Sequence, residues 1–128
     1  MTDEPLLHRA HADLIVERAA TQLRELLKTL AAEIDPFPPF PGAMFAYGIE
    51  VEPPVGSGDQ YGCVILAEDG DLYELKIGVD VEQATSGAGV AVRSEDRVSL
   101  DDLPPAEYAG YAHRAVTAAV EYLLSQQD

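Results

Sequence analysis

The sequence predicts an α+β fold in which a long N-terminal helix, an antiparallel meander of three or four strands and a C-terminal helix form two layers. Three observations predict it. Apolar residues recur at helical spacing over residues 5–35, follow strand patterns within residues 44–98, and return to helical spacing over residues 102–126. A chain of 128 residues is long enough for one hydrophobic core but not for two. We therefore expect a single domain, residues 1–128, with both helices on one face of the sheet.

The first predicted helix carries a stripe of apolar residues at alternating spacings of three and four. Pro5 suits the first helical turn, and Pro36 ends the helix because proline lacks a backbone N–H. We expect the stripe to face the core along the whole helix. It consists of Leu7, Ala10, Leu14, Val16, Ala20, Leu23, Leu27, Leu30 and Ile34.

A proline-rich connector, residues 36–43, follows this helix. Four prolines within seven residues exclude a helix and favour an extended chain. We interpret it as a stiff spacer whose Phe37 and Phe40 lie on the core. A ligand for aromatic-lined grooves is the alternative interpretation.

Strands are predicted over residues 44–52, 61–68 and 71–82, and residues 90–93 favour a short fourth strand. The second and third strands are joined by Asp-Gly at positions 69–70, which is typical of a two-residue type I′ turn. Such a turn places Val64 opposite Leu75, and we expect this pair to lie on the face that the helices cover. A slip of one residue would invert the two faces.

In this register the middle strand is apolar on both faces, whereas an antiparallel sheet normally has a polar outer face. The second face must then be covered by the connector Pro36–Gly42, by another subunit or by a different protein. An apolar centre with a charged rim is typical of protein interfaces. The predicted interface residues are Tyr61, Cys63, Ile65, Leu72 and Glu74.

The last predicted helix, residues 102–126, begins after Asp101 and Asp102, whose carboxylates suit the positive end of a helix dipole. Small side chains on its apolar stripe allow close approach to the sheet or to the first helix. The stripe consists of Ala109, Ala112, Val116, Ala119, Val120 and Leu123.

The charge balance narrows the possible partners. Eight basic residues face 23 acidic residues, for a net charge of −15. Residues 36–102 hold 3 basic and 13 acidic residues, and so contribute −10. Such a surface repels nucleic acid phosphates and anionic membranes, so we expect neither as a partner and favour a basic protein.

No apolar run approaches the roughly 20 residues that cross a bilayer. The acidic N-terminus and the single cysteine predict a reduced, cytoplasmic protein.

Two groups of residues are candidates for chemistry. His8 and His11, three residues apart on one helical face near Glu4, can hold zinc or another divalent metal. The alternative is a pair of surface histidines, since a metal site needs three or four convergent ligands. Cys63 lies opposite Lys76 in the predicted register, and a nearby ammonium makes a thiol more reactive. The alternative is a small core residue.

Together these observations favour a small, acidic, non-enzymatic protein-binding module of the chaperone, immunity or adaptor type. We expect it to form a homodimer and to engage a basic or partly apolar protein. The order of a helix, three strands and a helix, with small size and high acidity, is similar to that of dimeric chaperones of secreted proteins. The alternative function is binding of a small molecule or metal, or catalysis, at a site between the helices and the sheet.

Overall fold

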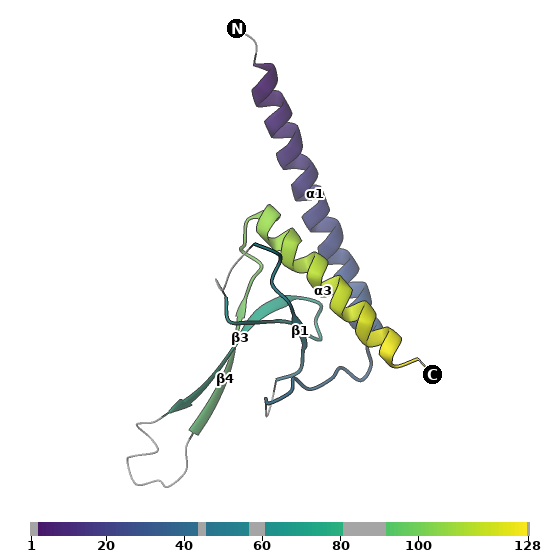
Figure 1. The fold of residues 1–128 in the computed structure, drawn as a ribbon, viewed down its shortest axis with the longest axis vertical. Helices are drawn as coiled ribbons and strands as arrows, with labels where there is room; N and C mark the ends of the chain where they lie inside the picture. The colour runs from purple at the N-terminus through teal and green to yellow at the C-terminus, as the bar shows by residue number, and fades with distance from the viewer. Residues whose placement is uncertain (1–2, 44–45, 57–60, 81–91, 128) are drawn as a thin grey trace.

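The computed structural model describes residues 3–43, 46–56, 61–80 and 92–127. A long helix, four antiparallel strands and a second long helix follow one another along the chain, which confirms the predicted α+β class (Figure 1). The elements are α1 (Glu4–Glu33), β1 (Ile49–Val51), β2 (Cys63–Leu66), β3 (Leu72–Asp80), β4 (Val92–Ser99) and α3 (Pro105–Ser125).

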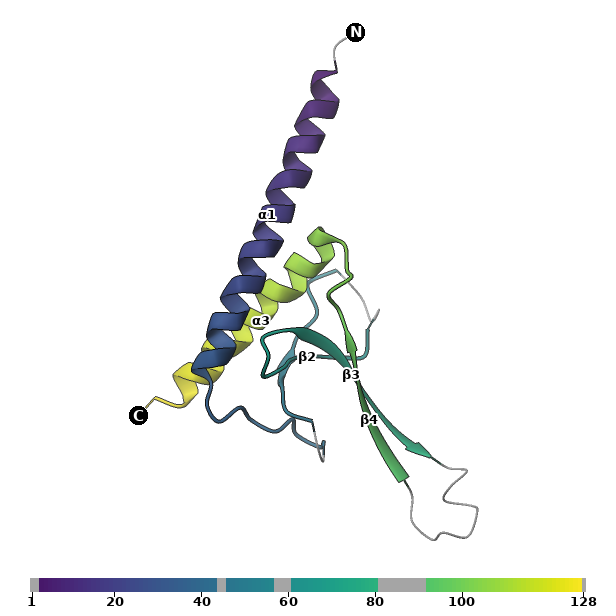
Figure 2. The same cartoon turned by 180° about the vertical axis from the view of Figure 1, so that it is seen from behind.

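The helix α1 packs only its C-terminal half against the rest of the protein. Ala20, Leu27 and Leu30 are buried, whereas every residue from Glu4 to Ile15 is exposed. In both views the N-terminal half extends beyond the other elements (Figures 1 and 2).

The prediction of one continuous core-facing stripe on α1 is therefore wrong for its N-terminal part, since Leu7 and Leu14 are exposed. The physical reason is the helical repeat. Leu14 and Val16 are two residues apart, which places them roughly 200° apart around the helix axis. The apolar residues of the first turns thus lie on a different face from those that meet the core.

The sheet has the strand order β1-β2-β3-β4, and every pairing is antiparallel. Both helices lie on the same side of it, and α3 packs along α1 (Figures 1 and 2). The core between helices and sheet consists of aliphatic and aromatic residues, and the described part of the chain buries no charged residue and, apart from tyrosines, no polar one. Its largest fully buried side chains are Leu27, Leu66, Leu72, Tyr108 and Tyr111.

The predicted register of β2 and β3 is wrong by one residue. Val64 pairs with Glu74, and Cys63 pairs with Leu75. The loop between the strands has three residues, 68–70, because the Ala67 N–H donates to the Asp71 carbonyl and the Gly70 N–H donates to the Ala67 carbonyl, both at 3.0 Å. A type I′ turn needs two residues with positive φ, but here only Gly70 adopts one, at +84°.

This slip exchanges the faces of β3. The helices cover Val64 and Leu72, whereas Leu75 lies on the second face beside Ile65. The prediction that Val64 and Leu75 share the helix-covered face is therefore wrong. A strand has a side-chain period of two, so one extra loop residue moves every β3 side chain to the opposite face.

The second face of the sheet is covered by the chain itself at Ile65, whereas farther along β3 Ile77 is 44% exposed. Ile65 is fully buried within one molecule. Gly48 lies so close to it that a Cβ atom there would be 2.8 Å from Ile65 Cδ1. The Gly48 N–H donates to the Pro38 carbonyl at 3.0 Å, and the Ala46 N–H donates to Glu95 Oε1 on β4 at 3.0 Å. The stretch that returns from the proline-rich connector thus covers the face at Ile65, and the connector is hydrogen-bonded to that stretch.

The fourth strand and the last helix also differ in detail from the prediction. β4 extends from Val92 to Ser99, farther along the chain than the predicted 90–93, of which residues 90–91 lie outside the described residues. Residues 96–99 are exposed, which permits the polar sequence of this strand. On α3 the buried stripe is shifted by about one residue, and Val120 is 40% exposed. The buried residues of α3 are Tyr108, Tyr111, Ala112, Ala115 and Ala119.

Candidate functional site

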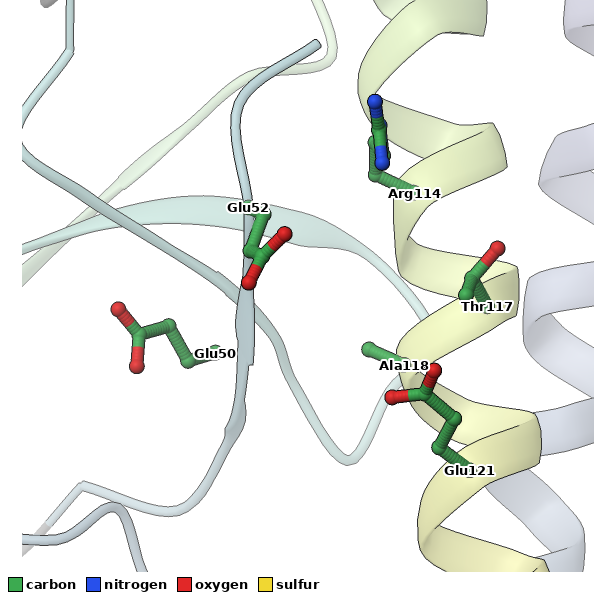
Figure 3. A pocket seen from close by; sticks show the side chains of 6 residues that line it. All are labelled: Glu50, Glu52, Arg114, Thr117, Ala118 and Glu121. Atoms are coloured by element: carbon green, nitrogen blue, oxygen red, sulfur yellow. The ribbon is translucent and has the colours of Figure 1, made fainter.

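A groove of about 210 Å³ lies between β1 and α3 (Figure 3). We call it the acidic groove because three of its side chains are carboxylates. Glu52 projects from the strand side and Glu121 from the helix side, with Arg114 farther along α3. The groove is lined by Glu50, Glu52, Arg114, Thr117, Ala118 and Glu121.

Local structure puts these side chains at the groove. Side chains alternate between the two faces along β1, which buries Val51, 2% exposed. Its two neighbours in the sequence, Glu50 and Glu52, are exposed. On α3 the spacings of three and four residues between Arg114, Ala118 and Glu121 align them along one helical face. That face adjoins the buried stripe of α3, so it lies next to the edge of the sheet.

The groove has an excess of negative charge. It combines three carboxylates with the single guanidinium of Arg114, and none of these four groups forms an ion pair with another described residue. The Thr117 hydroxyl donates to the His113 carbonyl at 3.3 Å, which leaves its oxygen as an acceptor. Such a lining accepts hydrogen bonds from ammonium or guanidinium groups, and the Ala118 methyl offers a small apolar surface.

The five predicted interface residues do not share one face. Leu72 lies in the core with the helices, and Glu74 is opposite Val64 on that same face, whereas Cys63 and Ile65 belong to the other face. Ile65 and Leu72 are fully buried within the single chain. The prediction of one apolar patch made by all five is therefore wrong, because the register differs by one residue.

Tyr61 and Glu74 are half-buried and serve contacts within the chain. The Tyr61 ring meets Tyr111 of α3 edge-on, with 5.7 Å between ring centroids, and its hydroxyl lies 3.4 Å from Glu107 Oε1. The carboxylate of Glu74 accepts a hydrogen bond from the Gly62 N–H at 2.8 Å. These contacts tie the entry of β2 to α3 and to β3.

Cys63 is not positioned as a reactive thiol. Its neighbour across the sheet is Leu75, not Lys76 as predicted, and the Lys76 ammonium lies 3.9 Å from Glu74 instead. Burial raises the pKa of the Cys63 thiol, and the negative charge of Glu50 raises it further. A higher pKa means less thiolate at neutral pH, so the structure favours the small-residue interpretation.

The predicted metal ligands lie on the projecting half of α1. His8 and His11 are both exposed, and the third histidine, His113, is on α3. Within the described residues no group of three or more histidine, cysteine, aspartate or glutamate side chains comes together. The metal-ligand role of His8 and His11 stays a prediction.

A second hollow, about 280 Å³, lies where the start of α3 meets α1. The Arg24 guanidinium is stacked over the Tyr108 ring, 4.6 Å from its centroid. Burial raises the pKa of Tyr108, and Arg24 opposes part of that rise. In the described structure the Tyr108 hydroxyl and Arg24 Nε are buried without a hydrogen-bond partner. Glu17 and Asp101 add two carboxylates to the lining.

Comparison with protein-family models, with curated proteins and with solved structures finds no match. No helix in the described ranges is both long and apolar enough to span a membrane. Function is therefore inferred from the geometry of this chain alone.

The acidic groove was not predicted from the sequence. Its one sequence signal was the alternation of Glu50 and Glu52 about an apolar residue on the first strand. Arg114 and Glu121 are more than 60 residues away in the sequence, and only the packing of α3 against β1 brings them there.

Proposed function

We propose that this protein is a non-enzymatic binding module that holds a basic segment of another protein in the acidic groove. One observation carries the proposal: Glu50 of β1, Glu52 just after it and Glu121 of α3 line one groove whose lining has only Arg114 to offset their charge. None of the three carboxylates forms an ion pair with a described residue, and such groups accept charge-assisted hydrogen bonds from lysine or arginine side chains.

The charge of the whole molecule supports the same partner. A net charge of −15 attracts a basic segment over a distance and raises its rate of encounter. The same charge disfavours nucleic acids and anionic membranes as partners. As part of this proposal the protein acts in the cytoplasm and as a homodimer, and the projecting half of α1 is available for self-association.

The test is binding of a fluorescein-labelled peptide of alternating lysine and valine, measured by fluorescence anisotropy. The triple variant Glu50→Gln, Glu52→Gln, Glu121→Gln removes the three groove charges and keeps side-chain size. We expect it to lose at least about tenfold in affinity, which corresponds to about 1.4 kcal/mol. Added salt should weaken binding to the unmodified protein.

The matched control removes three exposed carboxylates elsewhere, with Glu25→Gln, Glu33→Gln and Asp35→Asn. Both triple variants change the net charge from −15 to −12, since −15 + 3 = −12. We expect the control to lose less than about threefold. Equal losses of affinity in the two variants would show that peptide binding depends only on the net charge of the protein, and the proposal would then be wrong.

A second candidate function is binding of a small molecule in the hollow beside Arg24 and Tyr108. The observation that favours it is the pair of buried polar atoms, Tyr108 Oη and Arg24 Nε, that lack partners in the described structure. A carboxylate can satisfy both donors, and an amine can pair with Asp101 or Glu17. The chemistry therefore fits a small zwitterion such as an amino acid.

This candidate is tested by thermal shift with a panel of amino acids. A ligand that binds the folded state raises the melting temperature. The rise should disappear in Tyr108→Phe, which keeps the ring but removes the hydroxyl. A shift that persists in Tyr108→Phe would place the ligand elsewhere.

A further inference from the structure

The N-terminal half of α1 is a helix without a partner. Residues 4–15 are all exposed, although several of them are apolar. Leu6 is 64% exposed, Leu7 67% and Leu14 40%. These turns project beyond the other elements (Figures 1 and 2). Most of the stability of a helix in a protein comes from packing an apolar face, and here that face meets no other described residue.

The exposed apolar residues form a seam. Leu7, Ala10 and Leu14 follow one another at spacings of three and four residues, which is the pattern of two helices that pack side by side in a coiled coil. Ile15 is exposed as well, at 54%, but one residue beyond Leu14 it lies about 100° away around the helix. The seam is therefore a narrow stripe, suited to one partner helix.

The charges beside the seam fit a second copy of this chain. Asp13 lies on one flank of the seam, and Arg18 lies five residues later on the other flank. In a parallel helix pair, residues on opposite flanks meet across the interface with this offset of five residues. Asp13 of each copy then meets Arg18 of the other, which gives two equivalent ion pairs about the twofold axis.

An antiparallel pair would not have this complementarity. In that arrangement each flank faces the same flank of the other helix, so Arg18 meets the flank that holds Glu4 and His11, and Asp13 meets the flank that holds Leu6 and the other Asp13. Only the parallel arrangement gives Asp13 a basic partner.

The seam ends where α1 begins to pack inside its own chain. The next seam position after Leu14 is Glu17, and two glutamates facing each other would repel. From Ala20 onward the other side of α1 packs in the core. The two helices therefore pair from Leu7 to Arg18, and the seam does not continue beyond them.

We propose that the protein forms a parallel homodimer through Leu7, Ala10 and Leu14 of α1, with ion pairs between Asp13 and Arg18 of the two copies. This inference assigns the surface and the direction of the assembly in which the proposed binding module acts. None of the groove residues lies on the N-terminal half of α1, so the two proposals can fail independently.

The first experiment measures the mass of the full chain by sedimentation over a range of concentrations from micromolar to millimolar. We expect a dimer that dissociates on dilution, because the seam is short. The variant Leu7→Asp, Leu14→Asp should raise the dissociation constant at least about tenfold. The single variants Leu14→Asp and Ile15→Asp form a matched pair, since each adds one negative charge to the same exposed turns. Leu14→Asp should weaken the dimer, whereas Ile15→Asp, which lies outside the seam, should leave it unchanged.

The second experiment tests the direction of the pair. In a Cys63→Ser background, which removes the only native cysteine, Leu7→Cys and Leu14→Cys are introduced separately. In a parallel pair each new cysteine faces its own copy, so both variants should form a disulfide-linked dimer under mild oxidation. In an antiparallel pair no more than one of the two can do so.

The third experiment tests the ion pairs. Asp13→Arg alone should weaken the dimer, and the exchange Asp13→Arg with Arg18→Asp should restore it. Circular dichroism establishes that each variant is folded, and peptide binding per chain should be unchanged in Leu7→Asp, Leu14→Asp. A monomer at every concentration, equal loss of the dimer in Ile15→Asp, or crosslinking at one position alone would overturn the proposal.

Discussion

At the scale of single residues, Asp69 holds the turn between β2 and β3 with both of its carboxylate oxygens. Oδ1 accepts a hydrogen bond from the Asp71 N–H at 2.9 Å, and Oδ2 accepts one from the Tyr73 hydroxyl at 2.5 Å. The Arg97 guanidinium of β4 packs over a face of the Tyr73 ring, 4.6 Å from the ring centroid. One aspartate thus links the turn to the second strand of the hairpin.

This contact makes the stability of the protein fall with rising pH in the alkaline range. The hydrogen bond to Asp69, followed by burial, raises the pKa of Tyr73 to about 12. The unfolded value is about 10, so the folded state holds the phenol proton more tightly between the two values. The contribution is complete below pH 10 and is lost as pH rises toward 12. The urea midpoint should therefore fall less between pH 9 and pH 11 in Tyr73→Phe than in the unmodified protein. An equal fall in both would contradict this assignment.

At the scale of elements, the β2–β3 turn also positions the sheet against α1. Gly70 has a φ of +84°, and a Cβ atom on it would lie 2.7 Å from the Cα atom of Lys28. The absence of a side chain at Gly70 therefore allows both the turn conformation and the close approach of the helix backbone. The Lys28 ammonium lies 3.9 Å from Asp71 beside this contact, largely in solvent.

The variant Gly70→Ala should be strongly destabilising because it adds a clash with the α1 backbone to the strain of positive φ. Gly56 is the matched control, since its φ is +87° and nothing lies within 4 Å of an added Cβ. We expect Gly56→Ala to cost about 1 kcal/mol and Gly70→Ala about 3 kcal/mol, from strain together with overpacking. Denaturant unfolding measures both, and equal costs would show that the turn does not contact α1 closely.

The elements show where sequence patterns suffice and where they do not. The period of apolar residues and the positions of Pro5 and Pro36 predicted α1 correctly, because local sterics and periodicity decide a helix. The pattern did not distinguish a two-residue from a three-residue loop at Asp69-Gly70, since both use a glycine with positive φ. That difference of one residue inverted β3 and with it the predicted interface.

At the scale of the whole molecule, negative charge opposes the compact state. The net charge is −15, and the ion pairs found among described residues join side chains that are partly exposed. Such pairs contribute little, so repulsion among the carboxylates dominates the electrostatics of folding. The acidic groove is one part of this surface where the charge converges.

Salt should therefore stabilise the protein. The screening length shortens to about 8 Å at 0.15 M ionic strength, which weakens the repulsion between separated carboxylates. If the weaker repulsion stabilises the folded state by about 1 kcal/mol, the melting temperature rises by roughly 4 °C. Thermal unfolding in low and high sodium chloride measures the change. A melting temperature that falls with salt would mean that attractive ion pairs outweigh the repulsion.

The most direct test of the central claim is an NMR titration of the labelled full chain with the lysine–valine peptide. The account predicts that the largest amide shifts fall in β1 and in residues 114–121 of α3, on the two sides of the acidic groove. Shifts spread evenly over the acidic residues, or concentrated on the first turns of α1, would contradict recognition in the groove.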